Sequence, residues 1–408
     1  MNNYVKYMPE MLMGDELDKK LQILPDYDSK IRNSSVTERL MALQDLYSVF
    51  IPNQMSREIY SKLYLSLLRS MQKKQSILAV RQYNENSKLI RQNSYESIIG
   101  GSDSFTIIGP SGIGKSSAIS RAVNILTETP VLKFNNSMVI SCLQVQAPAD
   151  CSVKGLLLEI LRKADEVLNS NYYNNALKSH PTVDMLIGIV SQVALNHIGL
   201  LIVDEIQNVV NNKNGKTVIG TLTQLINNSG VSICMVGIPE STIFFEQAMM
   251  LARRSLGLNY CTMEYGEDFC DFCRVLLNYV YVKEKVDVSE ALFMWLYNHS
   301  SGNASIVVSL IHSAQEIAIL EGLEVLNTKI LDLAYERRMS MLHDYIEVPK
   351  INPPSNRKKR TELPEIIKDV TLDEFVSVFE ISSRAKVQGV DIVSELKKND
   401  ISIIEVAI

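Results

Sequence analysis

The sequence lacks the features that would place the chain outside the cytoplasm. Near its N-terminus there is no apolar segment of the kind that a secretory signal peptide contains. The most apolar window, residues 185–203, includes Gln192 and Asn196 and is typical of a helix followed by a strand, not of a membrane span. We therefore expect a cytoplasmic protein with no membrane partner.

Cysteine is scarce and shows no disulfide pattern. Several of the six cysteines lie in apolar stretches, as small hydrophobic residues do. Cys270 and Cys273 form a C-x-x-C in a helical stretch, with no second pair at the spacing of a zinc site. We interpret them as structural residues rather than as metal ligands or a redox pair. The other four are Cys142, Cys151, Cys234 and Cys261.

Neither sign of charge dominates the composition. The 41 Lys and Arg residues against 46 Asp and Glu residues give a formal net charge of −5, so the whole chain has no general attraction to nucleic acid. Any contact with DNA must come from a local basic surface. With 408 residues the chain exceeds one average domain, and we expect a core domain with attachments.

One octet carries a complete phosphate-binding motif. Residues 109–116 read Gly-Pro-Ser-Gly-Ile-Gly-Lys-Ser and fill the pattern G-x-x-x-x-G-K-[S/T]. An apolar run suited to a buried strand precedes the motif at 105–108, and a helical pattern follows it at 116–123. This order places backbone N–H groups and a helix N-terminus around a triphosphate. We therefore predict a nucleotide-binding loop and prefer it to an ordinary glycine-rich turn.

The residues of this loop have separate predicted tasks. The three glycines let the backbone approach the phosphates, while Lys115 reaches the β- and γ-phosphates and the Ser116 hydroxyl ligates Mg²⁺. ATP and Mg²⁺ are thus the predicted cofactors. The predicted nucleotide-binding residues of the loop are Gly109, Pro110, Ser111, Gly112, Ile113, Gly114, Lys115, Ser116 and Ser117.

A second motif supplies the carboxylates that such a site needs. Residues 199–203 form a short apolar run, typical of a central parallel strand buried on both faces, and Asp204 and Glu205 follow directly. Asp204 is expected at the carboxyl end of the strand, where open α/β sheets bind their ligands, and there it holds Mg²⁺ through water. Glu205 is the candidate for polarising the attacking water. The pair predicts ATP hydrolysis as well as binding.

Four segments are predicted along the chain. Residues 1–95 are a helical N-terminal extension, 96–265 an α/β domain with a parallel sheet covered by helices, 266–345 an α-helical lid, and 346–408 a basic linker with a partner-binding tail. The predicted strands are 104–108, 137–142, 200–203, 231–236 and 259–263.

The N-terminal extension contains one clear helical pattern. Residues 56–71 have helical periodicity, with a candidate cap at Asn53 or Ser56. Basic residues follow, and they either form a solvated helix face or face nucleotide or DNA phosphates. These residues are Lys73, Lys74, Arg81, Lys88 and Arg91, with Tyr83 among them.

An α/β P-loop domain followed by a small helical lid is the AAA+ layout, and the chain resembles one branch of it. It looks like the TnsC/TniB family of AAA+ transposition regulators, relatives of MuB. The resemblance covers about residues 35–340. Its motifs are Phe-Ile-Pro at 50–52, the loop at 109–116, the run at 200–205, Val-Ser-Ile-Cys-Met-Val-Gly-Ile-Pro at 231–239, Leu-Ala-Arg-Arg-Ser at 251–255 and Ser-Gly-Asn-Ala at 301–304.

The resemblance implies an ATP-dependent, DNA-binding oligomer in a bacterial cytoplasm. Such proteins assemble as rings or helical filaments on duplex DNA, receive a signal from a target-selection protein of the TniQ/TnsD kind, and recruit the transposase. Hydrolysis limits the polymer or disassembles it. The basic stretch at 349–360 and the short apolar-acidic segment at 369–379 suit tethered capture of the transposase.

The same resemblance assigns an arginine finger and reveals two departures. Arg253 or Arg254 is expected to reach the γ-phosphate held by a neighbouring subunit, with Arg253 slightly favoured and an exposed basic helix end as the alternative. The usual polar sensor at the end of the fourth strand is replaced by Val-Gly-Ile-Pro at 236–239, and Ile306 stands where lids often carry a sensor arginine. We therefore expect slow, regulatory hydrolysis.

The predicted DNA contacts follow the second strand. In the family, basic and hydroxyl residues there line the inside of the spiral, and the corresponding region here is 144–163, with Lys154, Arg162 and Lys163 as candidates. Their contacts would go to phosphates and would be sensitive to salt and independent of sequence. A solvated helix face is the alternative for each residue.

Two other functions compete with transposition. An initiator of the Orc/Cdc6 kind would need a winged-helix domain after the lid, and the roughly sixty residues of linker and tail fit that poorly. A signalling P-loop NTPase with protein partners alone would show no DNA dependence.

Overall fold

A computed structural model describes most of the chain ahead of its C-terminal part. The described residues all belong to one unit, Met1–Pro349. They are 8–74, 104–128, 130–134, 137–149, 152–210, 215–242 and 257–340. Outside them lie Arg253 and Arg254, Arg81, Tyr83, Lys88 and Arg91, and the predicted linker and tail at 346–408.

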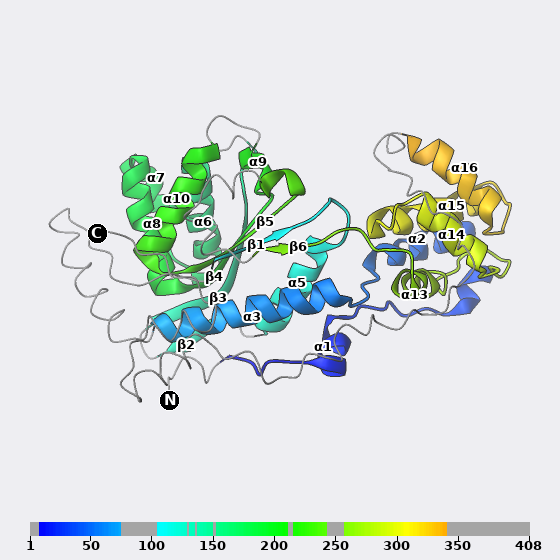
Figure 1. Ribbon diagram of the computed structural model, residues 1–408, viewed down its shortest axis with the longest axis horizontal. Coiled ribbons are helices and arrows are strands. Elements are labelled where there is room, and N and C mark those ends of the chain that lie inside the picture. Colours follow the sequence, from blue (N-terminus) through cyan, green and yellow to red (C-terminus); the bar gives the residue numbers. More distant parts are fainter. Residues whose placement is uncertain are drawn as a thin grey trace, which may run out of the picture. The chain divides into compact units, whose positions relative to one another are not determined.

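The described strands form one six-stranded sheet with the order β2-β3-β4-β5-β1-β6 (Figure 1). Every neighbouring pair is parallel except β2 and β3, which are antiparallel. The predicted α/β fold with a mostly parallel sheet is therefore confirmed, and the antiparallel edge strand β2 is an addition to it. The strands are β1 Phe105–Ile108, β2 Val131–Phe134, β3 Ser137–Gln146, β4 Ile198–Asp204, β5 Ser232–Gly237 and β6 Leu258–Asn259.

Strand β4 suits the centre of the sheet because its sequence is apolar up to Asp204 at its end, and all seven of its residues are buried. It pairs with β3 on one side and β5 on the other. Gly199 is required here by close packing, since a Cβ at this position would lie 2.6 Å from both the Met71 side chain and the Ser141 carbonyl oxygen.

Helices cover both faces of the sheet, and alternate strand residues point to opposite faces. On one face, Leu201 and Val203 of β4 join a core with α6 (Val153–Leu168), α8 (Val183–His197) and α10 (Gly215–Ser229). On the other, Leu200 and Ile202 join a core with α3 (Gln54–Lys74) and α5 (Lys115–Leu126). Figure 1 shows the α6–α8–α10 layer and α3 on opposite sides of the strands.

Helix α3 begins at Gln54, directly after Asn53, which is one of the two caps that the sequence left open. The Asn53 side chain accepts a hydrogen bond from the Ser56 backbone N–H at 2.9 Å, and the Ser56 hydroxyl accepts one from the Asn53 N–H at 2.9 Å. The two polar side chains thus satisfy N–H groups that the helix itself leaves free. Although α3 precedes residue 96, it shares a core with β1 and α5. The domain boundaries named above remain predictions.

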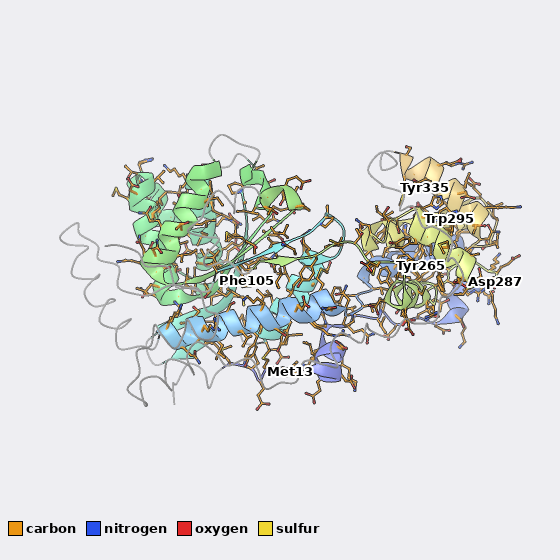
Figure 2. All side chains as sticks on the ribbon, in the orientation of Figure 1. Met13, Phe105, Tyr265, Asp287, Trp295 and Tyr335 are labelled. Atoms are coloured by element: carbon orange, nitrogen blue, oxygen red, sulfur yellow. The ribbon has the colours of Figure 1, made fainter. Side chains whose placement is uncertain are left out.

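The lid is helical within the described residues that follow β6. Its helices are α13 (Glu267–Leu276), α14 (Glu290–Asn298), α15 (Ala304–Leu320) and α16 (Thr328–Arg338). Aromatic rings join α14 to α16, since Trp295 meets Tyr335 edge-on with centroids 6.3 Å apart (Figure 2). Between them, Trp295 stacks on His299 with centroids 3.8 Å apart and Tyr335 meets His299 edge-on. The remaining helices of the described chain are α1 Gly14–Leu21, η2 Ser29–Asn33, α2 Val36–Leu43, η3 Gln44–Ser48, α7 Tyr172–Ser179, α9 Gln207–Val210 and η4 Pro239–Ser241.

Part of the N-terminal segment packs on the lid. The buried Arg39 of α2, 1 % exposed, donates two hydrogen bonds to the Glu324 carboxylate at 2.6 and 2.8 Å and one to the Tyr281 carbonyl at 3.1 Å. These bonds hold the pKa of Glu324 below its ordinary value. Residues ahead of the sheet therefore contribute to the lid as well as to the sheet's helical cover.

Cys270 and Cys273 are free thiols on α13, and Cys273 is buried, which raises its pKa. No group of three or more His, Cys, Asp or Glu side chains is placed to hold a metal ion among the residues that the structure describes. None of the helices described is both long and apolar enough to cross a membrane.

Candidate nucleotide-binding site

The loop between β1 and α5 has a backbone that needs glycine. Gly112 and Gly114 have φ angles of 82° and 98°, a region that other residues rarely adopt. A Cβ on Gly109 would lie 2.8 Å from the Tyr260 carbonyl oxygen, so the loop approaches the chain after β6 closely at this point. The Gly109 N–H donates to the Gly237 carbonyl at 3.3 Å, which ties the loop to the end of β5.

Lys115 is the first residue of α5 and lies inside the loop. Its side chain is 8 % exposed, and its Nζ donates to the carbonyls of Gly109 and Pro110, both at 2.7 Å. Burial lowers the pKa of this ammonium, while the charges of Asp204 and Glu205 act in the opposite direction. The two carbonyls hold the Lys115 ammonium at the loop, where it can meet a phosphate.

The two predicted metal ligands meet at the carboxyl end of β4. Asp204 is 6 % exposed, and its Oδ2 accepts a hydrogen bond from the Ser116 hydroxyl at 3.4 Å. Its Oδ1 accepts one from the Glu205 backbone N–H at 2.8 Å. A hydroxyl and a carboxylate beside a glycine-rich loop provide the hard oxygen donors that suit Mg²⁺, so the residues present fit the predicted ion.

Glu205 has an unusual backbone for its residue type. Its φ is 57°, in the left-handed region, which costs roughly 1–2 kcal/mol for a residue other than glycine. The Glu205 carbonyl accepts from the Asn208 N–H at 3.0 Å, and Asn208 Nδ2 donates to the Ala147 carbonyl at 3.0 Å. These bonds hold the strained turn, and such strain is typical of functional sites.

The Glu205 carboxylate also has a partner that the sequence did not predict. Gln207 Nε2 donates a hydrogen bond to Glu205 Oε2. The left-handed conformation of Glu205 turns the chain so that Gln207 can reach the Glu205 carboxylate. No sequence motif predicts this turn.

The lid contacts the loop directly. Asn303, the residue before α15, donates from Nδ2 to the Ser111 carbonyl at 2.8 Å, and the Ser305 backbone N–H donates to the Gly112 carbonyl at 3.0 Å. Neither residue was predicted to belong to the site. The helix-capping pattern around Asn303 was the available signal, because capping places this side chain at the exposed start of a helix.

The other predicted loop residues have simple positions. Ile113 is buried, Pro110 is half-buried, and Ser117 is exposed on α5. The predicted finger residues Arg253 and Arg254 lie outside the described part of the chain, so their role stays a prediction.

The candidate DNA-contacting residues all lie on α6. Lys154 is exposed in its first turn. Arg162 forms ion pairs with Glu159 and Glu166, and Lys163 pairs with Glu166 at 3.1 Å. The region predicted to contact DNA begins at residue 144, after the strand predicted at 137–142, but in the structure that strand continues to Gln146. The extension follows from pairing with β4, because Gln146 is opposite Asp204.

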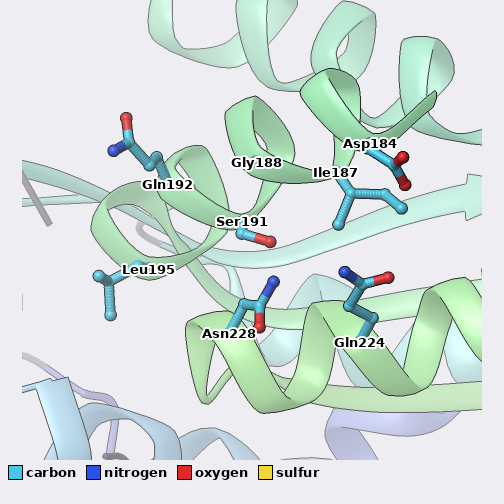
Figure 3. A pocket seen from close by; sticks show the side chains of 8 residues that line it. All are labelled: Asp184, Ile187, Gly188, Ser191, Gln192, Leu195, Gln224 and Asn228. Carbon is cyan, nitrogen blue, oxygen red and sulfur yellow. The ribbon is translucent and has the colours of Figure 1, made fainter. Parts of the chain in front are cut away.

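A cavity of about 190 Å³ lies elsewhere, between α8 and α10 (Figure 3). No residue of the loop lines it. The lining residues are Asp184, Ile187, Gly188, Ser191, Gln192, Leu195, Gln224 and Asn228.

Comparison with known proteins agrees with this description. Residues 99–242 match the family model of the AAA domain, and they contain both the phosphate-binding loop and the carboxylates that end β4. This part of the chain is therefore an AAA domain of the AAA+ P-loop fold and a nucleotide-binding domain by class. No curated protein sequence matches the chain.

Several solved structures are similar in shape at low identity. Drosophila ORC bound to DNA has a TM-score of 0.45 and 12% identity, with 98% of this chain and 86% of that chain covered. Aeropyrum pernix ORC2 in its ADP form has a TM-score of 0.40 and 14% identity, with 78% and 76% covered. Domain III of Thermotoga maritima DnaA has a TM-score of 0.37 and 14% identity, with 65% and 91% covered. Since all three TM-scores are below 0.5, no functional conclusion follows from them.

Proposed function

We propose that this protein is an ATPase that works as a slow switch and regulates DNA transposition on duplex DNA. The observation that supports the ATPase part is the hydrogen bond of 3.4 Å from the Ser116 hydroxyl to Asp204 Oδ2, close to the buried Lys115. A phosphate-binding loop with hydroxyl and carboxylate donors at its edge is the arrangement that P-loop ATPases use.

Each residue has a task in this proposal. Lys115 exchanges the carbonyls of Gly109 and Pro110 for phosphate oxygens and neutralises their charge. Ser116 and Asp204 hold Mg²⁺, which supplies charge neutralisation at the phosphates. Glu205 orients the attacking water and accepts its proton, with Gln207 fixing the carboxylate.

Slow turnover is supported by what stands at the end of β5 and at the start of the lid helix. Strand β5 ends at Gly237, whose carbonyl accepts from Gly109, and Ile238 follows without a polar side chain. Ile306, in the first turn of α15, stands where lids often carry a sensor arginine. Without a polar sensor after β5 and a sensor arginine in the lid, the transition state of hydrolysis receives less stabilisation. The site therefore suits a slow switch better than a motor.

The DNA and transposition part rests on the sequence resemblance described above. In this proposal the protein oligomerises on duplex DNA with ATP, contacts DNA phosphates through Lys154 and neighbouring residues, and links a target-selection protein to the transposase. An arginine from 253–254 completes the site of the adjacent subunit.

Electron microscopy of the purified full chain with duplex DNA tests this proposal. Samples contain ADP, a non-hydrolysable ATP analogue or no nucleotide. Rings or filaments on DNA with the analogue alone support an ATP-gated DNA polymer. Discrete particles that do not bind DNA in any sample, together with measurable nucleotide binding, would contradict the proposed DNA function and support only nucleotide binding.

A further inference from the structure

Asn303 connects the phosphate-binding loop to the lid through a single side chain. Its Nδ2 donates to the Ser111 carbonyl at 2.8 Å, and its Oδ1 accepts from the backbone N–H groups of Ser305 and Ile306 at 3.1 and 3.4 Å. One end of the amide thus holds the loop while the other caps α15. A movement of the phosphate-binding loop therefore changes the position of the Asn303 side chain at the start of α15, and a movement of α15 changes the hydrogen bond to the loop.

The packing at this contact leaves little room for independent movement. A Cβ on Gly112 would lie 2.7 Å from Asn303 Oδ1 and 3.1 Å from the Ser305 Cβ. The Ser305 N–H adds a second hydrogen bond, to the Gly112 carbonyl at 3.0 Å. Two consecutive carbonyls of the loop are therefore fixed by the first turn of the lid helix.

The backbone on the lid side of the contact is itself held. Gly302 has a φ of 72°, and a Cβ there would lie 1.9 Å from the Met263 carbonyl oxygen. The Met263 N–H donates to the Gly302 carbonyl at 3.0 Å, and the Asn303 N–H donates to the Ser300 carbonyl at 2.9 Å. Asn303 is thus presented to the loop from a fixed turn.

We infer that Asn303 is a positioning residue that couples the conformation of the phosphate-binding loop to the start of the lid helix. Lys115 holds the Gly109 and Pro110 carbonyls, directly before the Ser111 carbonyl that Asn303 holds. When Lys115 turns from these carbonyls to phosphate, the loop rearranges next to Asn303, and the change reaches α15 without a sensor arginine. This inference rests on the proposed function, because it assigns the regulation of the same site.

The matched variants are Asn303→Ser and Asn327→Ser. Serine is as good a cap as asparagine but is too short to keep both contacts, so N303S keeps the cap of α15 and loses the bond to Ser111. Asn327 caps α16 by accepting from the Ile330 N–H at 3.1 Å, and that hydrogen bond does not involve the loop. N327S therefore controls for replacing an asparagine cap in the same lid.

Two measurements on the full chain separate coupling from stability. The first is the Kd for ADP, and the second is hydrogen exchange of residues 303–310 with and without ADP. We expect N303S to bind ADP about fivefold more weakly, as the loss of one hydrogen bond implies, and to lose the ADP-dependent change in exchange. N327S should behave as the wild type in both. If N303S melts well below N327S, Asn303→Asp replaces it, since aspartate caps equally well but has no amide donor.

The outcomes distinguish this inference from the proposed function. Wild-type protein that does not bind ADP would overturn both. Wild-type protein that binds ADP without any change in exchange at 303–310, or an N303S variant that keeps the change and the wild-type Kd, would overturn only the coupling role of Asn303.

Discussion

Lys115 at the phosphate-binding loop and Arg162 on α6 are both cations, but the groups around them differ in kind. Lys115 donates its hydrogen bonds to the backbone carbonyls of Gly109 and Pro110, which are neutral dipoles, and the charges of Asp204 and Glu205 also act on it. Arg162 is surrounded by the carboxylates of Glu159 and Glu166, which cancel its charge. In the first arrangement an incoming phosphate replaces hydrogen bonds to neutral carbonyls, whereas in the second it has to break ion pairs. A basic residue in the sequence is therefore not equivalent to an available positive charge.

The largest expected effect comes from Glu205, which tests whether the loop region performs chemistry. Glu205→Gln should lower kcat for ATP by about a thousandfold, as expected for loss of a general base, and leave the Kd for ATP close to that of the wild type. Steady-state phosphate release and nucleotide titration measure the two quantities. Glu240→Gln, an exposed carboxylate in η4, is the control and should change neither. An E205Q variant that keeps its kcat would remove Glu205 from the mechanism.

Next in size is the loss of the loop's cation. Lys115→Ala should weaken ATP binding on the order of a hundredfold, because two charge-assisted contacts to phosphate are lost. Lys154→Ala serves as the control, since it removes a lysine of the other region and should leave the Kd for ATP unchanged. Titration with a fluorescent nucleotide analogue measures both. If K115A and K154A bound ATP equally weakly, the proposed difference between the phosphate-binding loop and α6 would be wrong.

A smaller effect separates two cations within α6. Lys154→Ala should lower the affinity for duplex DNA about threefold and reduce the salt slope by about one, as expected for one phosphate contact. Arg162→Ala should change neither, because its ion pairs already occupy the guanidinium. Binding isotherms at several salt concentrations provide the measurement. A larger loss for R162A than for K154A would show that the ion pairs do not hold Arg162 away from DNA.

The smallest effect concerns pH and the Glu159–Arg162 pair. Hydrogen bonds from Arg162 lower the pKa of Glu159 from its ordinary value of 4.5. Because the pKa is lower in the folded chain, the pair stabilises the fold above pH 4.5, and this contribution is lost as the pH falls through the lowered value. The thermal midpoint of the wild type should slightly exceed that of Glu159→Gln at neutral pH, and the difference should shrink as the pH falls below 4.5 and through the lowered pKa of Glu159. A difference independent of pH would contradict the ion-pair role.

The parts of the fold that the sequence predicted are those that local pattern determines. The run 199–203 is apolar without interruption and ends in acids, which suffices to predict a buried strand and the position of Asp204. Asn53 was a candidate cap because its side chain and the periodicity after it occur together. In both cases the residues that determine the structure are neighbours in the chain.

Two features were not predicted. Strand β2 has only four residues and pairs as an antiparallel edge with β3, its neighbour in the chain, although the sequence Asn135-Asn136 between two apolar runs was a usable turn signal. The bond from Asn303 to Ser111 joins residues 192 positions apart. A capping asparagine can be read from the sequence, but which second atom its amide contacts depends on how the lid packs on the loop.

The position of α3 also bears on how this protein can be divided. The matched AAA segment begins at residue 99, yet Leu63, Leu67 and Met71 of α3 are fully buried in one core with Leu200 and Ile202 of β4. A fragment limited to 99–242 would expose that strip of the sheet to water and would tend to aggregate. A soluble fragment of this chain that contains the phosphate-binding loop therefore has to include α3 and begin before residue 54, well upstream of the loop itself.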